Sequence, residues 1–138
     1  MSSEYRIYPV GEVQKKRGTT VLKIHKPFQD ALLGLDGFSH VIVFFWFDRN
    51  DTPEKRRILQ VHPRRDARNP LTGVFATRSP VRPNLIGHSI AKIKSIKDGS
   101  ITIDEIDAFD GTPIIDLKPY IPAEDAIPTA NVPEWVHK

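Results

Sequence analysis

Short apolar runs that stop at glycine, proline or aspartate constrain the fold of this chain more than any other feature. Eight runs have the composition of β-strands, and no long apolar pattern with helical periodicity lies between them. Twelve prolines further interrupt any long helix. The predicted strands lie near residues 5–14, 19–25, 39–47, 57–62, 73–77, 86–97, 100–107 and 113–117. Many short strands without long helices predict a mainly β protein, either a barrel or a sandwich.

The sequence Lys97-Asp98-Gly99-Ser100 predicts a tight hairpin between two of these strands. An Asp-Gly pair tolerates the positive φ angles that a primed two-residue turn requires. In the strand after the turn, the apolar alternation slips by one residue before Ile106. The slip predicts a β-bulge near Asp104-Glu105.

Helix is expected in only one or two short segments. Pro27 starts a turn that Gly34 closes, and Thr52 caps a second segment whose first helical residue is Pro53. After Pro119, further prolines predict an irregular C-terminal arm. Because 138 residues suffice for one hydrophobic core, we expect a single domain over residues 1–138.

The run Val41–Phe47 is apolar on both faces of its predicted strand. A barrel strand buries one face in the core, so the other face needs a cover. The short helix, the C-terminal arm and a second subunit are the three candidates, and we favour a homodimer. The aromatic rings of Trp46 and Phe75 are expected in the core.

Composition excludes several classes of protein. The chain has no cysteine, which excludes disulfides and thiolate chemistry. Its N-terminus is polar, and its longest apolar run is too short for a bilayer, so we expect a soluble cytoplasmic protein without membrane contact. The five histidines lack metal-binding spacings, so no metal is expected. Ser39 and His40 fall within a predicted strand, where adjacent side chains point to opposite faces and form no dyad.

Charge is distributed unevenly along the chain. The segment Arg49–Arg82 carries nine basic and three acidic residues, a net charge of +6. The segment Asp98–Asp125 carries eight acidic residues and one basic residue, a net charge of −7. The two segments form either two solvated faces or an anion-binding side. The basic residues are mostly arginines, which suit bidentate contacts with phosphate.

Two turn-rich segments carry the candidate chemistry. In Gly73–Asn84, two prolines flank Arg78 and Arg82, so the turn presents its charges without first having to be ordered. In Asp107–Tyr120, Asp110 precedes a glycine and is either a simple turn residue or a carboxylate that accepts a proton. The residues alone predict a small anion-binding β domain.

These segments closely resemble the TrmO family, also called TsaA-like. The resemblance covers nearly the whole chain, and the motifs that carry it are Leu35-Asp36-Gly37-Phe38-Ser39-His40, Gly73-Val74-Phe75-Ala76-Thr77-Arg78-Ser79-Pro80, Arg82-Pro83-Asn84, Asp110-Gly111-Thr112-Pro113 and Asp116-Leu117-Lys118-Pro119-Tyr120. The resemblance implies a single-sheeted antiparallel β-barrel that dimerises and binds S-adenosylmethionine. Characterised members methylate the exocyclic nitrogen of threonylcarbamoyl-adenosine beside the tRNA anticodon.

The resemblance implies the cofactor contacts, and the chemistry of methyl transfer to tRNA predicts roles for the other site residues. Asp110 would accept a proton or orient the substrate amide, and Arg78 would bind a carboxylate. Cofactor contacts would fall on Ser39, His40, Arg78, His88, Ala108, Phe109, Asp110 and Gly111. Phosphates of the tRNA anticodon loop would contact Arg64, Arg65, Arg68 and Arg82. Alternation places the His88 side chain on the face of Lys92, so its cofactor contact would run through backbone atoms.

Two features leave other functions open. Gln14–Arg17 stands where the family often has an Arg-Ser-Pro-aromatic loop, so that end of the pocket differs. The longer bacterial members also carry a C-terminal extension beyond the motifs matched here, so we expect tRNA docking to rely on the barrel. A methyltransferase acting on another nucleotide or small molecule, and a non-catalytic RNA- or ligand-binding barrel, are the alternatives.

Overall fold

The computed structural model describes residues 3–137, which form two compact units. Among the described residues, the first unit comprises residues 3–49 and 86–120, and the second comprises residues 50–85 and 121–137. No helix within residues 3–137 combines the length and the apolar character that a bilayer crossing requires.

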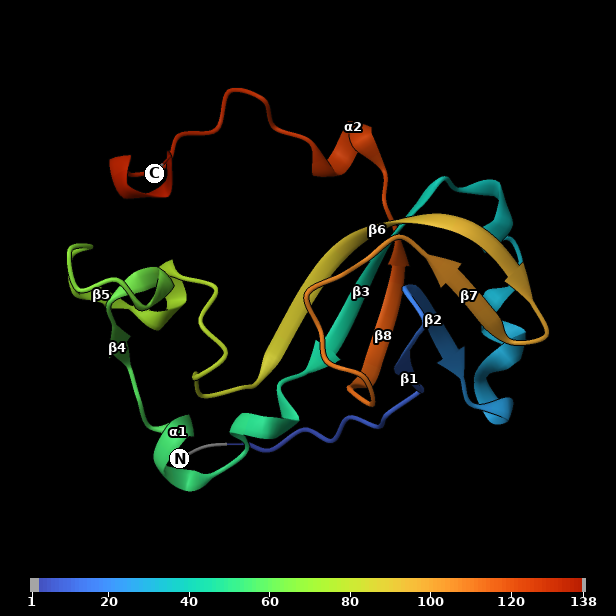
Figure 1. The fold of residues 1–138 in the computed structure, drawn as a ribbon, viewed down its shortest axis with the longest axis horizontal. Helices are drawn as coiled ribbons and strands as arrows, with labels where there is room; N and C mark the ends of the chain where they lie inside the picture. The colour runs from blue at the N-terminus through green and yellow to red at the C-terminus, as the bar shows by residue number, and fades with distance from the viewer. Residues whose placement is uncertain (1–2, 138) are drawn as a thin grey trace. The chain divides into compact units, whose positions relative to one another are not determined.

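The first unit is a closed antiparallel barrel of six strands in the order β1-β2-β7-β6-β3-β8 (Figure 1). It confirms the mainly β, single-sheeted barrel expected from the sequence. Its strands are β1 (Gly11–Lys16), β2 (Thr19–Ile24), β3 (His40–Trp46), β6 (Ile86–Lys97), β7 (Ser100–Ile103) and β8 (Pro113–Pro119). Two 3-10 segments, η1 (Lys26–Leu32) and η2 (Leu35–Gly37), connect β2 to β3, and η3 (Asp48–Asn50) follows β3.

The second unit contains only short elements. A two-stranded sheet pairs Gln60 with Gly73 and Val61 with Thr72. Its elements are α1 (Pro53–Arg56), β4 (Gln60–Val61), η4 (Pro63–Arg65), β5 (Thr72–Gly73), η5 (Val74–Ala76), α2 (Pro122–Asp125) and η6 (Glu134–His137). Apart from these last two segments, residues 121–137 have no regular structure, which matches the irregular arm expected after Pro119.

Alternation along β3 fills the barrel core. Val41, Val43 and Phe45 are buried, whereas the residues between them are partly exposed. Gly87 of β6 pairs with Phe45 and makes room for its ring. A Cβ atom at Gly87 would lie 2.5 Å from Cζ of Phe47 and 2.8 Å from Cε1 of Phe45. The core packing therefore requires a glycine at this position.

Two tight turns of the same type join neighbouring strands. Asp98 (φ 50°) and Gly99 (φ 75°) form the hairpin turn that the sequence predicts. Arg17 (φ 51°) and Gly18 (φ 77°) form an equivalent turn between β1 and β2. In the second unit, Oγ1 of Thr52 accepts a hydrogen bond from the Lys55 amide at 3.2 Å, which confirms the predicted helix cap.

Several predicted strands are shorter than expected. β1 begins at Gly11 rather than near residue 5, because Pro9 has no amide hydrogen to extend the ladder. The segment 57–62 contributes only Gln60 and Val61, and 73–77 contributes only the end of β5. β7 ends at Ile103 instead of residue 107.

The bulge predicted near Asp104-Glu105 is wrong in position. The register shifts between Ile93 and Ser95 of β6, so the extra residue is Lys94 on the partner strand. Asp104 instead continues the pairing: its amide donates to the Lys92 carbonyl at 3.1 Å, and its Oδ1 accepts from the Lys92 amide at 2.9 Å. A phase slip in one strand therefore reflected irregular pairing with its neighbour.

Replacing Gly87 by alanine should destabilise the barrel. The new methyl group would overlap two aromatic rings, and overpacking of this kind costs about 1–3 kcal/mol. Urea unfolding followed by tryptophan fluorescence measures the loss. Gly37→Ala is the matched control, because no heavy atom lies within 4 Å of its Cβ position. Equal stability of the two variants would contradict the packing argument.

Candidate functional site

The loop before β8 is fastened to β1 by backbone hydrogen bonds. The Val13 amide donates to the Thr112 carbonyl at 2.9 Å, and the Gly111 amide donates to the Val13 carbonyl at 2.7 Å. One step further along β1, the Lys15 amide donates to Oδ1 of Asp110 at 2.8 Å. The Asp110 carboxylate therefore takes the place of a strand partner and is held in a fixed position.

The Lys15 side chain secures the same loop. Its Nζ donates to the Ile106 carbonyl at 2.7 Å and lies 3.5 Å from Oε1 of Glu105. Sequence reasoning did not single out Lys15, which lies in the segment that departs from the family pattern. Residues 14–16 belong to β1 and Arg17 belongs to its tight turn, so the structure has a strand end and hairpin there.

An arginine–aromatic pair lies beside this carboxylate loop. The guanidinium carbon of Arg49 is 3.7 Å from the ring centroid of Phe109. Phe109 is 60% exposed, whereas the preceding Ala108 is buried. The sequence analysis missed Arg49 because nothing local connects it with residue 109. Only the antiparallel pairing of β3 with β8 brings the end of one strand to the start of the other.

Ser39 and His40 are hydrogen bonded to each other, so the expectation that they form no pair is wrong. Oγ of Ser39 lies 2.7 Å from Nδ1 of His40. The strand begins at His40, and Ser39 precedes it, so strict alternation does not apply. The His40 carbonyl accepts from the Tyr120 amide at 3.1 Å, and the two rings meet edge to face.

The predicted cofactor residues lie at two ends of the barrel strands. Ser39 and His40 adjoin the end of β8, whereas Ala108–Gly111 precedes its start. β8 has seven residues, which separate the two groups by about 20 Å at a rise of about 3.3 Å per residue. Within one barrel, these residues do not meet.

His88 lies between these ends, opposite Phe44, with ring centroids 6.3 Å apart. Its side chain is exposed, as is that of Lys92 four residues further along β6. The alternation therefore places both on the outer face, as the sequence analysis expected.

The Arg78 turn belongs to the second unit and is tied together by side-chain hydrogen bonds. Oγ1 of Thr77 accepts from the Ser79 amide at 3.1 Å, and Oγ of Ser79 accepts from the Val81 amide at 3.2 Å. Nη1 of Arg82 donates to the Thr77 and Ser79 carbonyls at 3.2 and 3.0 Å. Arg82 therefore braces the turn, while the Arg78 side chain is exposed.

Phe75 contradicts the expectation that its ring is buried. It is 82% exposed, whereas the neighbouring Val74 is 2% exposed. In place of the predicted strand, the 3-10 segment η5 begins at Val74. The side chains from Val74 onward therefore do not alternate between the two faces as they would in a strand. The exposed ring lies three residues before Arg78 and adds an apolar surface to this turn.

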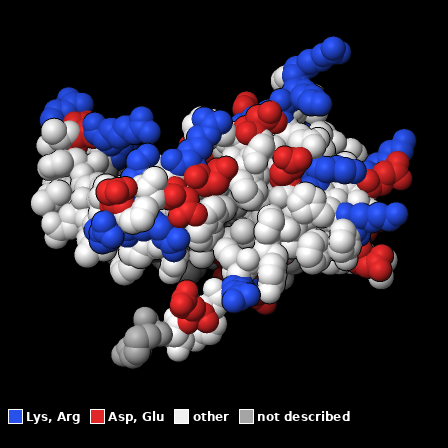
Figure 2. Space-filling model, turned by 90° about the horizontal axis from the view of Figure 1, so that it is seen from below, with Lys and Arg blue, Asp and Glu red and all other residues white. Residues whose placement is uncertain are grey.

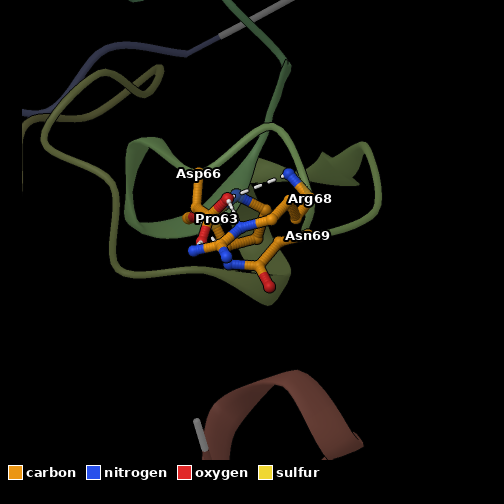
Figure 3. A network of polar contacts seen from close by, with 4 residues as sticks. All are labelled: Pro63, Asp66, Arg68 and Asn69. Carbon is orange, nitrogen blue, oxygen red and sulfur yellow. Dashed lines mark hydrogen bonds and ion pairs between the residues drawn. The ribbon is translucent and has the colours of Figure 1, made fainter.

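The other predicted RNA-binding arginines lie on the loop after β4. Arg68 forms a fork with Asp66, with Nε to Oδ1 at 3.0 Å and Nη2 to Oδ2 at 2.9 Å (Figure 3). The hydrogen bond to Asp66 raises the pKa of the Arg68 guanidinium. Asn69 is buried and donates to the Pro63 carbonyl at 2.9 Å, which fixes the loop from inside.

Arg64 and Arg65 are neighbours with different surroundings. Nη2 of Arg64 donates to the Val136 carbonyl at 2.7 Å, and its guanidinium lies 5.9 Å from the Trp135 ring. The Arg65 side chain is exposed, and no hydrogen bond or ion pair of that side chain is found within residues 3–137. Both residues have positive φ angles. Arg65 is thus the arginine of this loop most available to an anion.

Acidic and basic side chains intersperse on the molecular face drawn in Figure 2. Within the described residues, no group of three His, Cys, Asp or Glu side chains is placed to hold a metal ion.

Comparison with known proteins places this barrel and its two loops in a family. The sequence model of the tRNA-methyltransferase O N-terminal domain matches residues 4–126. A crystal structure of TrmO from Pseudomonas aeruginosa superposes with a TM-score of 0.75 and 28% identity over 98% of this chain and 63% of that one. This domain therefore has the architecture of a TrmO-type barrel.

Two curated relatives differ in how much of them the chain spans. A probable S-adenosyl-L-methionine-binding protein of Methanocaldococcus jannaschii is 52% identical over 83% of this chain and 90% of its own length. The tRNA (adenine(37)-N6)-methyltransferase of Mus musculus is 39% identical over 85% of this chain but only 27% of its own length. The chain belongs to the tRNA-methyltransferase O N-terminal domain family.

Replacing Asp110 by alanine should loosen the junction between the loop and β1. Losing the hydrogen bond from the Lys15 amide should cost about 1 kcal/mol and speed hydrogen exchange at that amide about fivefold. Exchange measured by NMR tests this. Asp107→Ala is the control, because the Asp107 side chain is exposed and nearby. Unchanged exchange at Lys15 in Asp110→Ala would contradict the anchoring role.

Proposed function

We propose that this domain is an S-adenosylmethionine-dependent methyltransferase that modifies the exocyclic nitrogen of threonylcarbamoyl-adenosine next to the tRNA anticodon. The observation that carries the proposal is the family match over residues 4–126, which includes both the Arg78 turn and the Asp110 loop. Because the proposed substrate is tRNA, the domain would act in the cytoplasm. The partner would be the anticodon loop, and no metal is required.

The residues at the start of β8 fit the cofactor chemically. S-adenosylmethionine supplies, when bound, a methyl group activated by a sulfonium. Asp110 offers a fixed carboxylate for hydroxyl groups or positive charge, and the exposed Phe109 ring offers a face for a cation or a planar base. Arg49, stacked on that ring, offers donors for a carboxylate. Ala108 and Gly111 would contribute backbone groups, and His88 would contact the cofactor through backbone atoms.

Two residues are proposed as the catalytic pair. The substrate nitrogen is urea-like, so its lone pair is delocalised, and loss of its proton makes it a better nucleophile. Asp110 would accept that proton or orient the amide, with the oxygen that does not receive the Lys15 amide. Arg78 would hold a carboxylate of the cofactor or of the threonyl group, and its turn is already rigid before a ligand arrives.

The arginines of the second unit would hold phosphates of the anticodon loop. Arg65 is the strongest of these candidates because its side chain is exposed and has no internal partner within residues 3–137. Arg64 and Arg68 would contribute positive charge while keeping their contacts with Val136 and Asp66. Arg82 would act mainly by bracing the turn beside Arg78.

A homodimer would bring the two groups of cofactor residues closer together. The outer face of β3 carries Ile42, Phe44 and Trp46, opposite Ile90, His88 and Ile86 of β6. Ile86 and Ile90 are 45% and 50% exposed, so this apolar face suits a second copy. Two-fold packing with the β3 strands antiparallel would bring Ser39 and His40 of one subunit toward the Asp110 end of the other.

Substitutions at the proposed catalytic pair should abolish methyl transfer. Arg78→Ala and Asp110→Asn should each lower the rate on tRNA containing threonylcarbamoyl-adenosine by about 100-fold or more. Mass spectrometry of the nucleosides after incubation with S-adenosylmethionine measures the product. Asparagine keeps an acceptor for the Lys15 amide, so Asp110→Asn separates the chemical role of the carboxylate from its anchoring role.

Asp36→Ala is the control for this assay, since Asp36 is an exposed carboxylate in η2. It should retain full activity. Full turnover in Arg78→Ala or Asp110→Asn would remove that residue from the proposed pair. Absence of any methylated nucleoside with the unmodified chain would contradict the proposed substrate.

One alternative is favoured by a specific observation. The Methanocaldococcus jannaschii relative, 90% of whose length this chain covers, is named only for S-adenosyl-L-methionine binding. A methyltransferase for another nucleotide or small molecule would bind S-adenosylmethionine in calorimetry yet leave the tRNA unmodified. A non-catalytic RNA-binding barrel would bind tRNA without the cofactor.

If the proposed homodimer forms through the outer face of β3 and β6, one charged residue placed in that face should prevent dimerisation. Ile90→Lys should convert the dimer to a monomer, because two lysines would be buried in the shared face. Sedimentation equilibrium at micromolar concentration measures the mass. Leu33→Lys, at an exposed apolar position in the loop before β3, should remain dimeric. A monomeric unmodified chain would overturn this arrangement.

A further inference from the structure

A pocket of about 370 Å³ lies in the first unit between the 3-10 segments that follow β2 and the later half of β8. Its volume falls in the range of pockets that hold small molecules. Apolar side chains form nearly all of its lining, among them Val10, Ile24, Phe28, Leu32, Leu35 and Leu117. At its rim, Leu33 is 95% exposed. An open apolar hollow of this size favours burial of an apolar group.

One charged side chain distinguishes the pocket from a packing defect. Asp116 is the sole charged residue among the described residues that line it. Oδ1 of Asp116 accepts a hydrogen bond from the Leu117 amide at 2.8 Å, which fixes the carboxylate. The remaining carboxylate oxygen can accept a hydrogen bond from a ligand that carries a donor. A positive donor suits it best, since charge-assisted hydrogen bonds are the stronger ones.

The neighbouring strand edge does not suit an extended peptide. β1 pairs with β8 only at Ile114 and Pro113, so residues 115–119 have no β1 partner. Along this edge, the Leu117 amide is already bonded to Asp116, and Pro119 has no amide hydrogen. A strand that adds to an edge depends on such donors. The geometry therefore favours a compact ligand that enters the pocket over a peptide that lies along it.

The pocket is separate from the Ala108–Gly111 part of the proposed cofactor site, whereas Phe38 in its lining directly precedes the Ser39–His40 part. It adjoins Asp116–Pro119 in the later half of β8, whereas Ala108–Gly111 precedes the start of that strand. No residue proposed to contact S-adenosylmethionine or tRNA lines the pocket. A ligand bound there would leave the Asp110 loop open.

We propose that this pocket binds a small amine whose apolar ring enters the hollow while its ammonium group pairs with Asp116. The apolar part gains from leaving water. The ammonium stays at the partly solvated rim, where its desolvation cost is low and the fixed carboxylate is its partner. The specificity is for a cationic head over a neutral or anionic one on the same ring.

Three indole compounds that share a ring and differ in charge test this. Tryptamine is the cation, 3-methylindole the neutral analogue and indole-3-acetate the anion. In a ¹H–¹⁵N titration of the full chain, tryptamine should shift the amides of Leu32, Leu35 and Leu117. It should bind about tenfold more tightly than 3-methylindole, as expected for one charged hydrogen bond, and indole-3-acetate should bind more weakly than both.

Two variants separate the charge from the cavity. Asp116→Asn keeps an acceptor for the Leu117 amide and should lower tryptamine affinity to that of 3-methylindole, with neutral binding unchanged. Ala31→Phe should fill the pocket and weaken all three compounds. Ala31 is an exposed residue of η1 that lines the pocket, so this variant should fold.

Four outcomes would overturn the proposal. They are no amide shifts with any compound, shifts confined to Ala108–Gly111, equal affinity for tryptamine and indole-3-acetate, and displacement of tryptamine by S-adenosylmethionine. The last would make the pocket part of the cofactor site. Loss of methyl transfer in the assay above would leave this binding test unaffected, because tryptamine binding is measured without tRNA.

Discussion

The closure of the barrel between β1 and β8 is the constraint on which the rest of the structure depends. Only Gly11 with Ile114 and Glu12 with Pro113 form this closing ladder. It requires a glycine, since a Cβ atom at Gly11 would overlap the Lys23 carbonyl oxygen. The loop before β8 then continues the closure through its bonds to Val13 and Lys15. The Asp110 part of the candidate site thus extends the seam, that is, the junction between β1 and β8. Its geometry depends on the hydrogen bonds that close the barrel there.

Local signals predicted the fold well where structure is decided locally. The strand 86–97 was predicted with both ends correct, because a proline-rich turn precedes it and Asp98-Gly99 ends it. The Thr52 cap followed from residue type and spacing alone. Burial of Phe75 was mispredicted, because a 3-10 turn after Gly73 changes which side chains face inward. Short strands that depend on a single partner were consistently overestimated in length.

The site was predictable in part. Turn residues made the Arg78 and Asp110 segments visible, and family resemblance gave them roles to test. The contacts that position them were not visible, because they join residues far apart in the chain. Lys15 and Asp110 are 95 residues apart, and Arg49 meets Phe109 only through strand pairing. The Ser39–His40 pair depended on a strand starting one residue later than expected.

The long sequence separation of the Lys15–Asp110 bond has a consequence for folding kinetics. Hairpins such as β1–β2 and β6–β7 close short loops, whereas the bond between Lys15 and Asp110 joins residues that are 95 positions apart. The entropic cost of a loop grows with its length, and non-local contacts slow folding. We therefore expect the carboxylate loop to reach its final geometry among the last events of folding. Recovery of ligand binding after refolding reports on formation of the native topology as a whole.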